Sequence, residues 1–185
     1  DVNDWALSLF PSSVTLSAPV KEKVAEIKKA YTAVEDQALA ALRFVQDEVR
    51  YLGMEMGEGS HRPNNPNKVF AQRFGDCKDK TYLLVTLLRA MNMEAYPVLI
   101  NTDFKKALFH WLPAAIAFDH VAVQLKLNGV TYRFDPTINY QRGSLKQVSF
   151  PDYQCGLVVS PQTTELTNIP VQDNGKVTVK EKFVI

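Results

Sequence analysis

The sequence predicts an α+β fold in which helices come first and antiparallel strands follow. Residues 20–51 carry apolar side chains at intervals of three and four, which is the repeat of amphipathic helices. Residues 120–134 alternate apolar and more polar side chains around Asn128-Gly129, a dipeptide typical of a two-residue hairpin turn. Between these regions, a longer helix is expected to start near residue 77. We expect this helix to pack on the antiparallel sheet.

Two helices are expected in the first third of the chain. The first begins at Pro19 and carries its apolar residues on one face, with lysines and glutamates on the other. The second is expected over residues 34–51. Residues 53–68 are rich in glycine, proline and asparagine and are expected to form a loop. Asn67 is then expected to cap a short helix that ends at Gly75.

A lone cysteine, Cys77, stands where the next helix begins. Apolar side chains recur at helical spacing over residues 82–91. Gly75 permits a tight backbone turn, and Asp76 is a good residue to cap the helix. In a first helical turn, unpaired backbone N–H groups and the helix dipole favour a thiolate over a thiol. Asp79 is expected to form an exposed pair with a neighbouring lysine.

The helix is followed by a strand and a long connection. Residues 95–100 are apolar enough for a strand, and Pro97 indicates an edge strand or a first position. The connection over residues 101–117 is unusually apolar for a loop. Loops of this length commonly form lids or binding surfaces, so we expect this one to border the active cleft, with Trp111 contacting substrate. The alternative is a helical insert packed on the core.

The predicted hairpin fixes which side chains meet. With the two-residue turn setting the register, Val123 opposes Phe134 and Ala122 opposes Asp135. His120 then lies on the same face as Ala122 and diagonal to Asp135. Diagonal neighbours lie roughly 7–8 Å apart at the backbone, a distance that long side chains bridge. The sequence therefore predicts a histidine and an aspartate side by side.

A cysteine at a helix start, a histidine on a strand and a carboxylate on the next strand form a nucleophile, a base and an orienting group. The Cys77 thiolate would attack an acyl carbon. His120 would hold the proton and pass it to the leaving group, while Asp135 accepts a hydrogen bond from the other ring nitrogen. Two alternatives stay open. His120 could instead be a structural residue bonded to Asp119. Asp135 precedes a proline and could instead be a turn-forming residue.

The chain resembles the transglutaminase-like core over roughly residues 35–160. Four motifs carry the resemblance: RFGDCKD at residues 73–79 with the helix after it, FDHV at 118–121, FDPT at 134–137, and YLGME at 51–55. The resemblance is to a bacterial branch, papain-like in its chain order of Cys, His and Asp, whose core follows a β-rich domain in a secreted or envelope protein.

The resemblance implies a cysteine-dependent acyltransferase or peptidase that acts on amide bonds of peptides or proteins and needs no cofactor. Hydrolysis is slightly favoured over cross-linking. The resemblance also implies a periplasmic or secreted location and Tyr51 as a side-chain donor to the oxyanion. For Tyr51 the alternative is a core aromatic residue. For the whole chain, the alternative to an enzyme is a non-catalytic module of a larger envelope protein that binds peptide or glycan.

Composition limits the possible partners. The net charge of +1 gives no reason to expect nucleic acid or an anionic membrane surface as a partner. No run approaches the roughly twenty apolar residues that span a bilayer, so direct membrane insertion is not expected. Two cysteines and three histidines without a CxxC pair argue against a metal site. Cys155 is expected to be a small buried hydrophobe, and Cys77 to be free.

We expect one core domain over residues 1–170. Residues 171–185 end in an alternating pattern typical of a strand. This strand either begins a further β-rich domain or belongs to the core.

Overall fold

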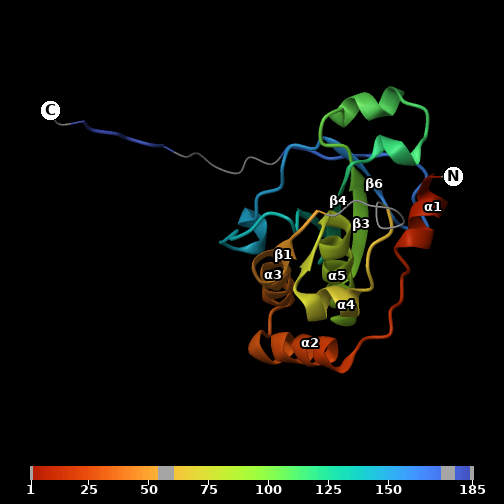
Figure 1. The fold of residues 1–185 in the computed structure, drawn as a ribbon. Coiled ribbons are helices and arrows are strands. Elements are labelled where there is room, and N and C mark those ends of the chain that lie inside the picture. The colour runs from red at the N-terminus through yellow and green to blue at the C-terminus, as the bar shows by residue number, and fades with distance from the viewer. Residues whose placement is uncertain (1, 54–60, 172–177, 184–185) are drawn as a thin grey trace.

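The computed structural model describes residues 2–53, 61–171 and 178–183 and confirms the α+β fold (Figure 1). Its helices are α1 (Val2–Leu9), α2 (Ala18–Ala30), α3 (Val34–Arg43), α4 (Pro66–Gln72) and α5 (Cys77–Ala90). Helix α5 lies against an antiparallel sheet, and α2, α3 and α4 pack on α5. The start of α5, where Cys77 lies, is therefore held between the sheet and a layer of helices.

The main sheet has the strand order β5-β4-β3-β6-β7, and all its neighbouring strands are antiparallel. Its strands are β3 (Glu94–Ile100), β4 (His120–Leu127), β5 (Val130–Phe134), β6 (Cys155–Val158) and β7 (Thr167–Asn168). The predicted hairpin joins β4 and β5, with a positive φ of 50° at Asn128 and 76° at Gly129. Its register is the predicted one, because Val123 pairs with Phe134.

Helix α5 is the centre of the core. Every residue from Cys77 to Leu88 is buried. Leu83, Leu84, Leu87 and Leu88 have no exposed surface. Burying one such side chain stabilises a fold by about 1.5–3 kcal/mol, so the four contribute roughly 6–12 kcal/mol. Burial of this helix is therefore a main part of the packing that carries Cys77 at its first turn.

The second expected helix is shorter than predicted. Helix α3 continues as a π-helical turn, Phe44–Glu48, and the helical backbone ends there. Tyr51 lies instead on strand β1 (Arg50–Tyr51), which pairs in parallel with β2 (Phe74–Gly75). The backbone N–H groups of its two neighbours donate to the carbonyls of Arg73 and Gly75 at 2.8 and 2.9 Å. This pairing ends the helix before Tyr51.

The expected cap and end of the short helix α4 are wrong. Asn65 is the cap, because its side chain accepts a hydrogen bond from the N–H of Asn67 at 2.9 Å. The helix ends at Gln72 and not at Gly75, since Arg73 takes a left-handed conformation with φ 61°. Helix α1, which was not expected, packs its apolar face against residues of α5 and the sheet.

Strand β3 lies between β4 and β6, so the expectation that Pro97 marks an edge strand is wrong. The carbonyl of Pro97 accepts a hydrogen bond from the N–H of Val159 at 2.8 Å. The carbonyl and the N–H position of one strand residue point to the same side. The missing donor of Pro97 therefore falls just beyond the last β3–β6 pairs, Val98 with Val158 and Leu99 with Leu157.

The C-terminal residues 178–183 are exposed and form no strand (Figure 1). The other residues of the expected strand, and residues 54–60 of the expected loop, lie outside the described part of the chain. The domain boundary near residue 170 stays a prediction. Over residues 2–53, 61–171 and 178–183, no helix has the length and apolarity needed to cross a bilayer.

Candidate active site

Cys77 is the first residue of α5, as predicted, and a reciprocal capping box fixes the backbone before it. The N–H of Asp79 donates to Asp76 Oδ1 at 3.2 Å, and the N–H of Asp76 donates to Asp79 Oδ2 at 3.4 Å. Asp79 is only 3% exposed, so the expectation of an exposed pair is wrong. Its Oδ1 instead accepts the N–H of Asn64 at 2.7 Å, and the buried Lys78 pairs with Asp76.

The glycine before this box is required for space. A Cβ placed on Gly75 would lie 2.6 Å from the Cβ of Asp79 and 2.9 Å from its Oδ2. Its φ is not among the positive ones, so conformational freedom is not the reason. Only a residue without a side chain lets the β2 backbone come this close to the cap of α5.

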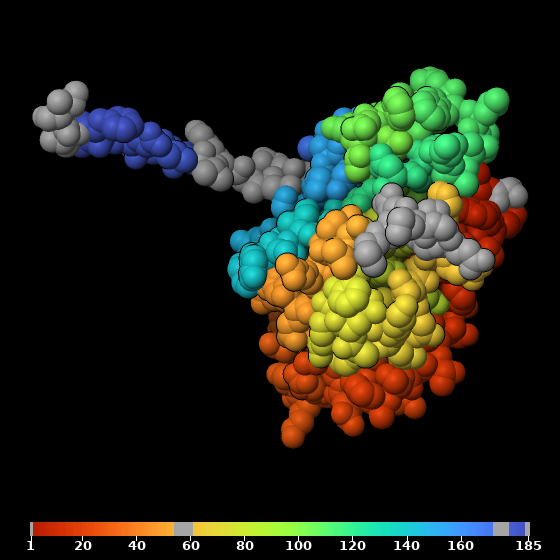
Figure 2. All heavy atoms as spheres, in the orientation of Figure 1, coloured from red at the N-terminus to blue at the C-terminus, as the bar shows by residue number. Residues whose placement is uncertain are grey.

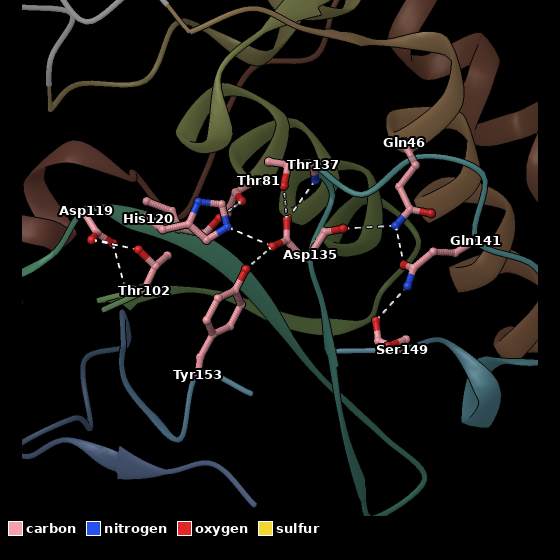
Figure 3. A network of polar contacts seen from close by, with 11 residues as sticks. Gln46, Thr81, Thr102, Asp119, His120, Asp135, Thr137, Gln141, Ser149 and Tyr153 are labelled. Carbon is pink, nitrogen blue, oxygen red and sulfur yellow. Dashed lines mark hydrogen bonds and ion pairs between the residues drawn. The ribbon is translucent and has the colours of Figure 1, made fainter. Parts of the chain in front are cut away.

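His120, the first residue of β4, lies beside Asp135, as the hairpin register predicts. Its Nε2 is 2.9 Å from Asp135 Oδ2 (Figure 3). The His120 side chain is 12% exposed and that of Asp135 only 1%. Cys77 also acts on His120, because its hydrogen bonding and charge raise the pKa of the imidazole, and both residues line one hollow. Since Nε2 is taken by Asp135, Nδ1 is the ring nitrogen left for Cys77.

Asp135 is held by more partners than the sequence indicated. Oδ1 accepts the N–H and the hydroxyl of Thr137, at 2.9 and 2.6 Å, which is the turn-forming role considered as an alternative. Oδ2 accepts the hydroxyl of Tyr153 at 2.6 Å in addition to His120. Asp135 therefore forms the turn and orients the histidine at once, and the two interpretations do not compete.

Charge and hydrogen bonding keep this pair ionised. Burial alone would lower the pKa of His120, but its hydrogen bonds and its attraction to Asp135 and Cys77 outweigh burial and raise the pKa to about 10. Burial alone would raise the pKa of Asp135, but His120, Thr137 and Tyr153 together hold it below its usual range. An imidazolium beside a carboxylate is thus the stable form at neutral pH.

Gln46 and Lys80 connect this pair to the helices. Gln46, in the π-helical turn, donates from Nε2 to the backbone carbonyl of Asp135 at 3.0 Å (Figure 3). Lys80 has no exposed surface and donates to the carbonyls of Gln46 and Val49. Burial lowers the pKa of Lys80 to about 8, although the negative charges of Asp135 and Asp47 partly offset the effect. A buried amine thus ties α5 to the turn that holds Asp135.

Cys77 and His120 line one hollow of about 240 Å³, which we call the cysteine hollow. Trp5 of α1 and His61 also line it, with their ring centroids 5.7 Å apart at 72°. The Cys77 residue is 6% exposed, and what is exposed faces this hollow. A substrate in the hollow would therefore lie against both the sulfur and the imidazole.

Tyr51 and Trp111, the two further candidates from the sequence, are not among the described residues that line this hollow. Tyr51 pairs with Gly75, two residues before Cys77, and is 45% exposed. Trp111 lines a neighbouring hollow, and Phe118 lines both. Tyr153, Gln46 and Trp5 were missed, because no periodicity or turn signal links them to the cysteine or histidine. His61, which the sequence favoured as a surface loop residue of no special role, lines the cysteine hollow.

The other expectations for polar groups concern metals and disulfides. Both cysteines are free and buried, and Cys155 donates its thiol to the Lys105 carbonyl at 3.1 Å. Over the ranges that the structure describes, no group of three or more His, Cys, Asp or Glu side chains is arranged to hold a metal ion.

The chain is an α+β protein in which helices precede an antiparallel sheet. Its candidate centre combines a cysteine at a helix start with a histidine–aspartate pair. The family model described as the transglutaminase-like superfamily matches residues 21–143, more than half of the chain. The chain belongs to this superfamily, which confirms the resemblance seen in its motifs.

Two solved structures are similar to this chain. One, from Parabacteroides distasonis and described as a "putative protease", has a TM-score of 0.66 at 10% identity and covers 92% of this chain and 31% of its own. The other, from Cytophaga hutchinsonii and described as a "putative cysteine protease", has a TM-score of 0.41 at 15% identity. The match covers 74% of this chain and 36% of that one. This chain thus spans about a third of the length of each. No curated protein matches the sequence.

Proposed function

We propose that this chain is a cysteine-dependent enzyme that transfers or hydrolyses the acyl group of peptide or protein amides. Cys77 is the nucleophile, His120 the acid and base, and Asp135 the orienting group. The contact that carries the proposal is the 2.9 Å bond between His120 Nε2 and Asp135 Oδ2, which leaves the other ring nitrogen available to Cys77 in the hollow that both residues line. Membership of the superfamily supports a cysteine peptidase or acyltransferase.

In the first half of the reaction, the Cys77 sulfur attacks the carbonyl carbon and forms a tetrahedral intermediate. The backbone N–H of Cys77 is the first candidate donor to the oxyanion, and Tyr51 remains a second. His120, already protonated, gives its proton to the departing amine as the C–N bond breaks. A thioester on Cys77 and a free amine result.

In the second half, neutral His120 takes a proton from the acyl acceptor. If the acceptor is water, its oxygen attacks the thioester, and a carboxylic acid and the thiol are released. If the acceptor is a primary amine, a new amide forms instead. We favour water, because Asp119 is the one carboxylate among the described residues that line the cysteine hollow, and it is bonded to Thr102 at 2.9 and 3.0 Å.

The setting of the enzyme is also proposed. We place it in the periplasm or outside a bacterial cell, with a peptide or protein as its substrate. We further propose β-rich domains beside this core, as the resemblance of its motifs implies; the chain spans about a third of the length of the similar Parabacteroides distasonis structure.

The test is a comparison of Cys77→Ala with Cys155→Ala on peptide amides, with and without added primary amines. The Cys155 variant is the matched control, because Cys155 is buried and bonded away from His120. We expect Cys77→Ala to lose turnover while keeping its fold, and Cys155→Ala to keep both. Release of acid identifies a peptidase or deamidase, and incorporation of the amine identifies a cross-linking enzyme.

Undiminished turnover in Cys77→Ala would overturn the proposal. Absence of turnover, together with slow alkylation of Cys77 by iodoacetamide that His120→Ala leaves unchanged, would favour a non-catalytic module that binds peptide or glycan.

A further inference from the structure

A second hollow lies beside the cysteine hollow, and the reaction described above does not use it. It has a volume of about 230 Å³, and ten of its fourteen lining residues are apolar, among them Leu108, Trp111, Phe118, Leu157 and Leu166. We call it the apolar hollow. Residues 104–118 supply many of its lining residues, and Figure 2 shows this segment in green beside the red residues of α1.

The two hollows are neighbours at three places: at Phe118, on the sheet and on α1. Phe118 lines both of them. Leu157 lines the apolar hollow and Leu99 the cysteine hollow, and these two residues are paired across β3 and β6. Helix α1 lines the apolar hollow with Val2 and the cysteine hollow with Trp5, one helical turn further on.

Their separation matches a short step along a peptide. Paired residues on adjacent strands lie about 5 Å apart at Cβ, and three helical residues rise about 4.5 Å. An extended peptide advances about 3.3 Å per residue. A side chain in the apolar hollow therefore belongs to a residue one or two positions from the amide that Cys77 attacks.

The walls of the apolar hollow are held in place by the protein itself. Leu108 and Ala117 pack with Cys155 of β6 in a small buried cluster. Asn101 donates to the Ala117 carbonyl at 2.9 Å and accepts from the N–H of Phe104 at 2.6 Å. The Trp111 ring packs on Phe104 with centroids 4.5 Å apart. The hollow is therefore preformed, as binding pockets usually are.

Size and polarity select the occupant. A cavity of about 150 Å³ lined by aliphatic and aromatic side chains accepts a benzene ring, so this hollow has room for an aromatic side chain. Its one charged lining residue, Glu165, would repel an acidic side chain. Residues 104–118 also present Trp111 at 44% and Leu112 at 88% exposure, so the entrance itself is apolar.

We infer that the apolar hollow is a specificity site for an aromatic or large aliphatic side chain of the peptide substrate, one or two residues from the reacting amide. The inference deepens the proposed function and rests on it for the reaction, but the binding of the side chain can be measured without turnover.

The binding measurement uses the two tryptophans of the chain, because Trp5 lines one hollow and Trp111 the other. In Trp5→Phe, Trp111 is the one remaining tryptophan, and it can be excited selectively over the tyrosines. Titration with N-acetylphenylalanine amide should change this fluorescence in a saturable way, with a dissociation constant on the order of 1 mM for one buried side chain. N-acetylalanine amide and N-acetylglutamate amide should leave it unchanged.

Two further variants in the Trp5→Phe background locate the effect. Ala114→Phe places a ring in the hollow that Ala114 lines, and it should abolish the response to the phenylalanine amide. Ile116→Phe is the matched control, since Ile116 is 87% exposed and lines neither hollow, and it should keep the response. Circular dichroism and alkylation of Cys77 show whether each variant is folded.

The kinetic measurement uses peptide amides in which Ala, Leu, Phe or Glu occupies one position at a time. At a position one or two residues from the cleaved bond, Phe should exceed Ala in kcat/KM by about tenfold or more. Ala114→Phe should remove this preference, whereas Ile116→Phe should keep it.

The outcomes separate the two ideas. Turnover that depends on Cys77 but ignores the side chain at every position would overturn the specificity site and leave the proposed function standing. Absence of any saturable response to the phenylalanine amide in folded Trp5→Phe would also overturn it. Loss of the proposed function would appear as turnover that Cys77→Ala does not reduce, whatever the fluorescence shows.

Discussion

The hydroxyl of Tyr153 donates to Oδ2 of Asp135 at 2.6 Å, and this is the same oxygen that binds His120. The ring of Tyr153 also lies against the imidazole, with centroids 5.6 Å apart. Tyr153 lies in the loop before β6. Its hydroxyl contacts Asp135 of the proposed triad, and its ring contacts His120. It is therefore a positioning residue, and it makes a distinctive prediction.

Tyr153→Phe should lower stability by about 1.5–3 kcal/mol, the net value of a hydrogen bond to a charged group, and kcat/KM by about tenfold. The lost bond is one of those that lower the pKa of Asp135, so the acid limb of the kcat/KM profile should move to higher pH. Urea unfolding and a pH–rate profile measure both effects.

The control for this variant is Tyr96→Phe. The Tyr96 hydroxyl also donates to a carboxylate, Glu94 at 3.1 Å, but on the exposed surface away from His120. It should cost less than about 1 kcal/mol and leave the pH profile unchanged. An equal effect of the two variants, or an unmoved acid limb in Tyr153→Phe, contradicts the positioning role.

His120 should make stability depend on pH in the alkaline range. Its pKa rises from 6.5 to about 10 on folding, so its contribution is complete below about pH 6.5 and is lost as the pH rises to about 10. The difference in unfolding free energy between the wild type and His120→Gln should therefore shrink over this range. Urea titrations at several pH values measure it, and a constant difference would show that the imidazolium is not stabilised by folding.

Lys80→Met should destabilise the protein by roughly 2–6 kcal/mol, because the carbonyls of Gln46 and Val49 lose their buried donor. Turnover should also fall, since Gln46 holds the backbone of Asp135. Lys126→Met is the control: the Lys126 side chain is 51% exposed, and the loss should be below about 1 kcal/mol.

The same variant gives a pH effect of opposite sign to that of His120. Folding lowers the pKa of Lys80 from 10.5 to about 8, so the wild type bears a cost at neutral pH that is relieved between about pH 8 and pH 10.5. Relative to Lys80→Met, the wild type should therefore gain stability over this range. A loss over the same range would contradict the burial of a charged amine.

Gly75→Ala should displace the cap of α5, because its Cβ would lie 2.6 Å from the Cβ of Asp79. Forcing an extra carbon into such a packed position costs about 1–3 kcal/mol, and Cys77 would move with the cap, so turnover should fall by at least about tenfold. Thermal unfolding and kcat/KM are the measurements.

Gly129→Ala is the matched control. Gly129 has a φ of 76° and nothing within 4 Å of a built Cβ, so the substitution strains only the hairpin turn. It should lower stability by about 1–2 kcal/mol, with kcat/KM unchanged. Similar losses of turnover in the two variants would show that general destabilisation, and not displacement of the cap, is responsible.

The sequence predicted those parts of the site that depend on neighbours in the chain. The two-residue turn at Asn128-Gly129 fixes the register of one hairpin, and from that register follows the meeting of His120 and Asp135. Capping chemistry at Asp76 likewise places Cys77 at a helix start. Turn geometry and capping act over a few residues, which is why a single sequence contains them.

Packing of distant segments decided the rest. The burial of Asp79 and Lys80, the central place of β3, and the contacts of Tyr153, Gln46 and Trp5 all join residues whose separation along the chain carries no repeat. A polar side chain is expected to be exposed when only its residue type is known. It can be buried where the fold supplies partners for its hydrogen bonds. Those partners exist only once α1, α5, the π-helical turn and the sheet have assembled around one another.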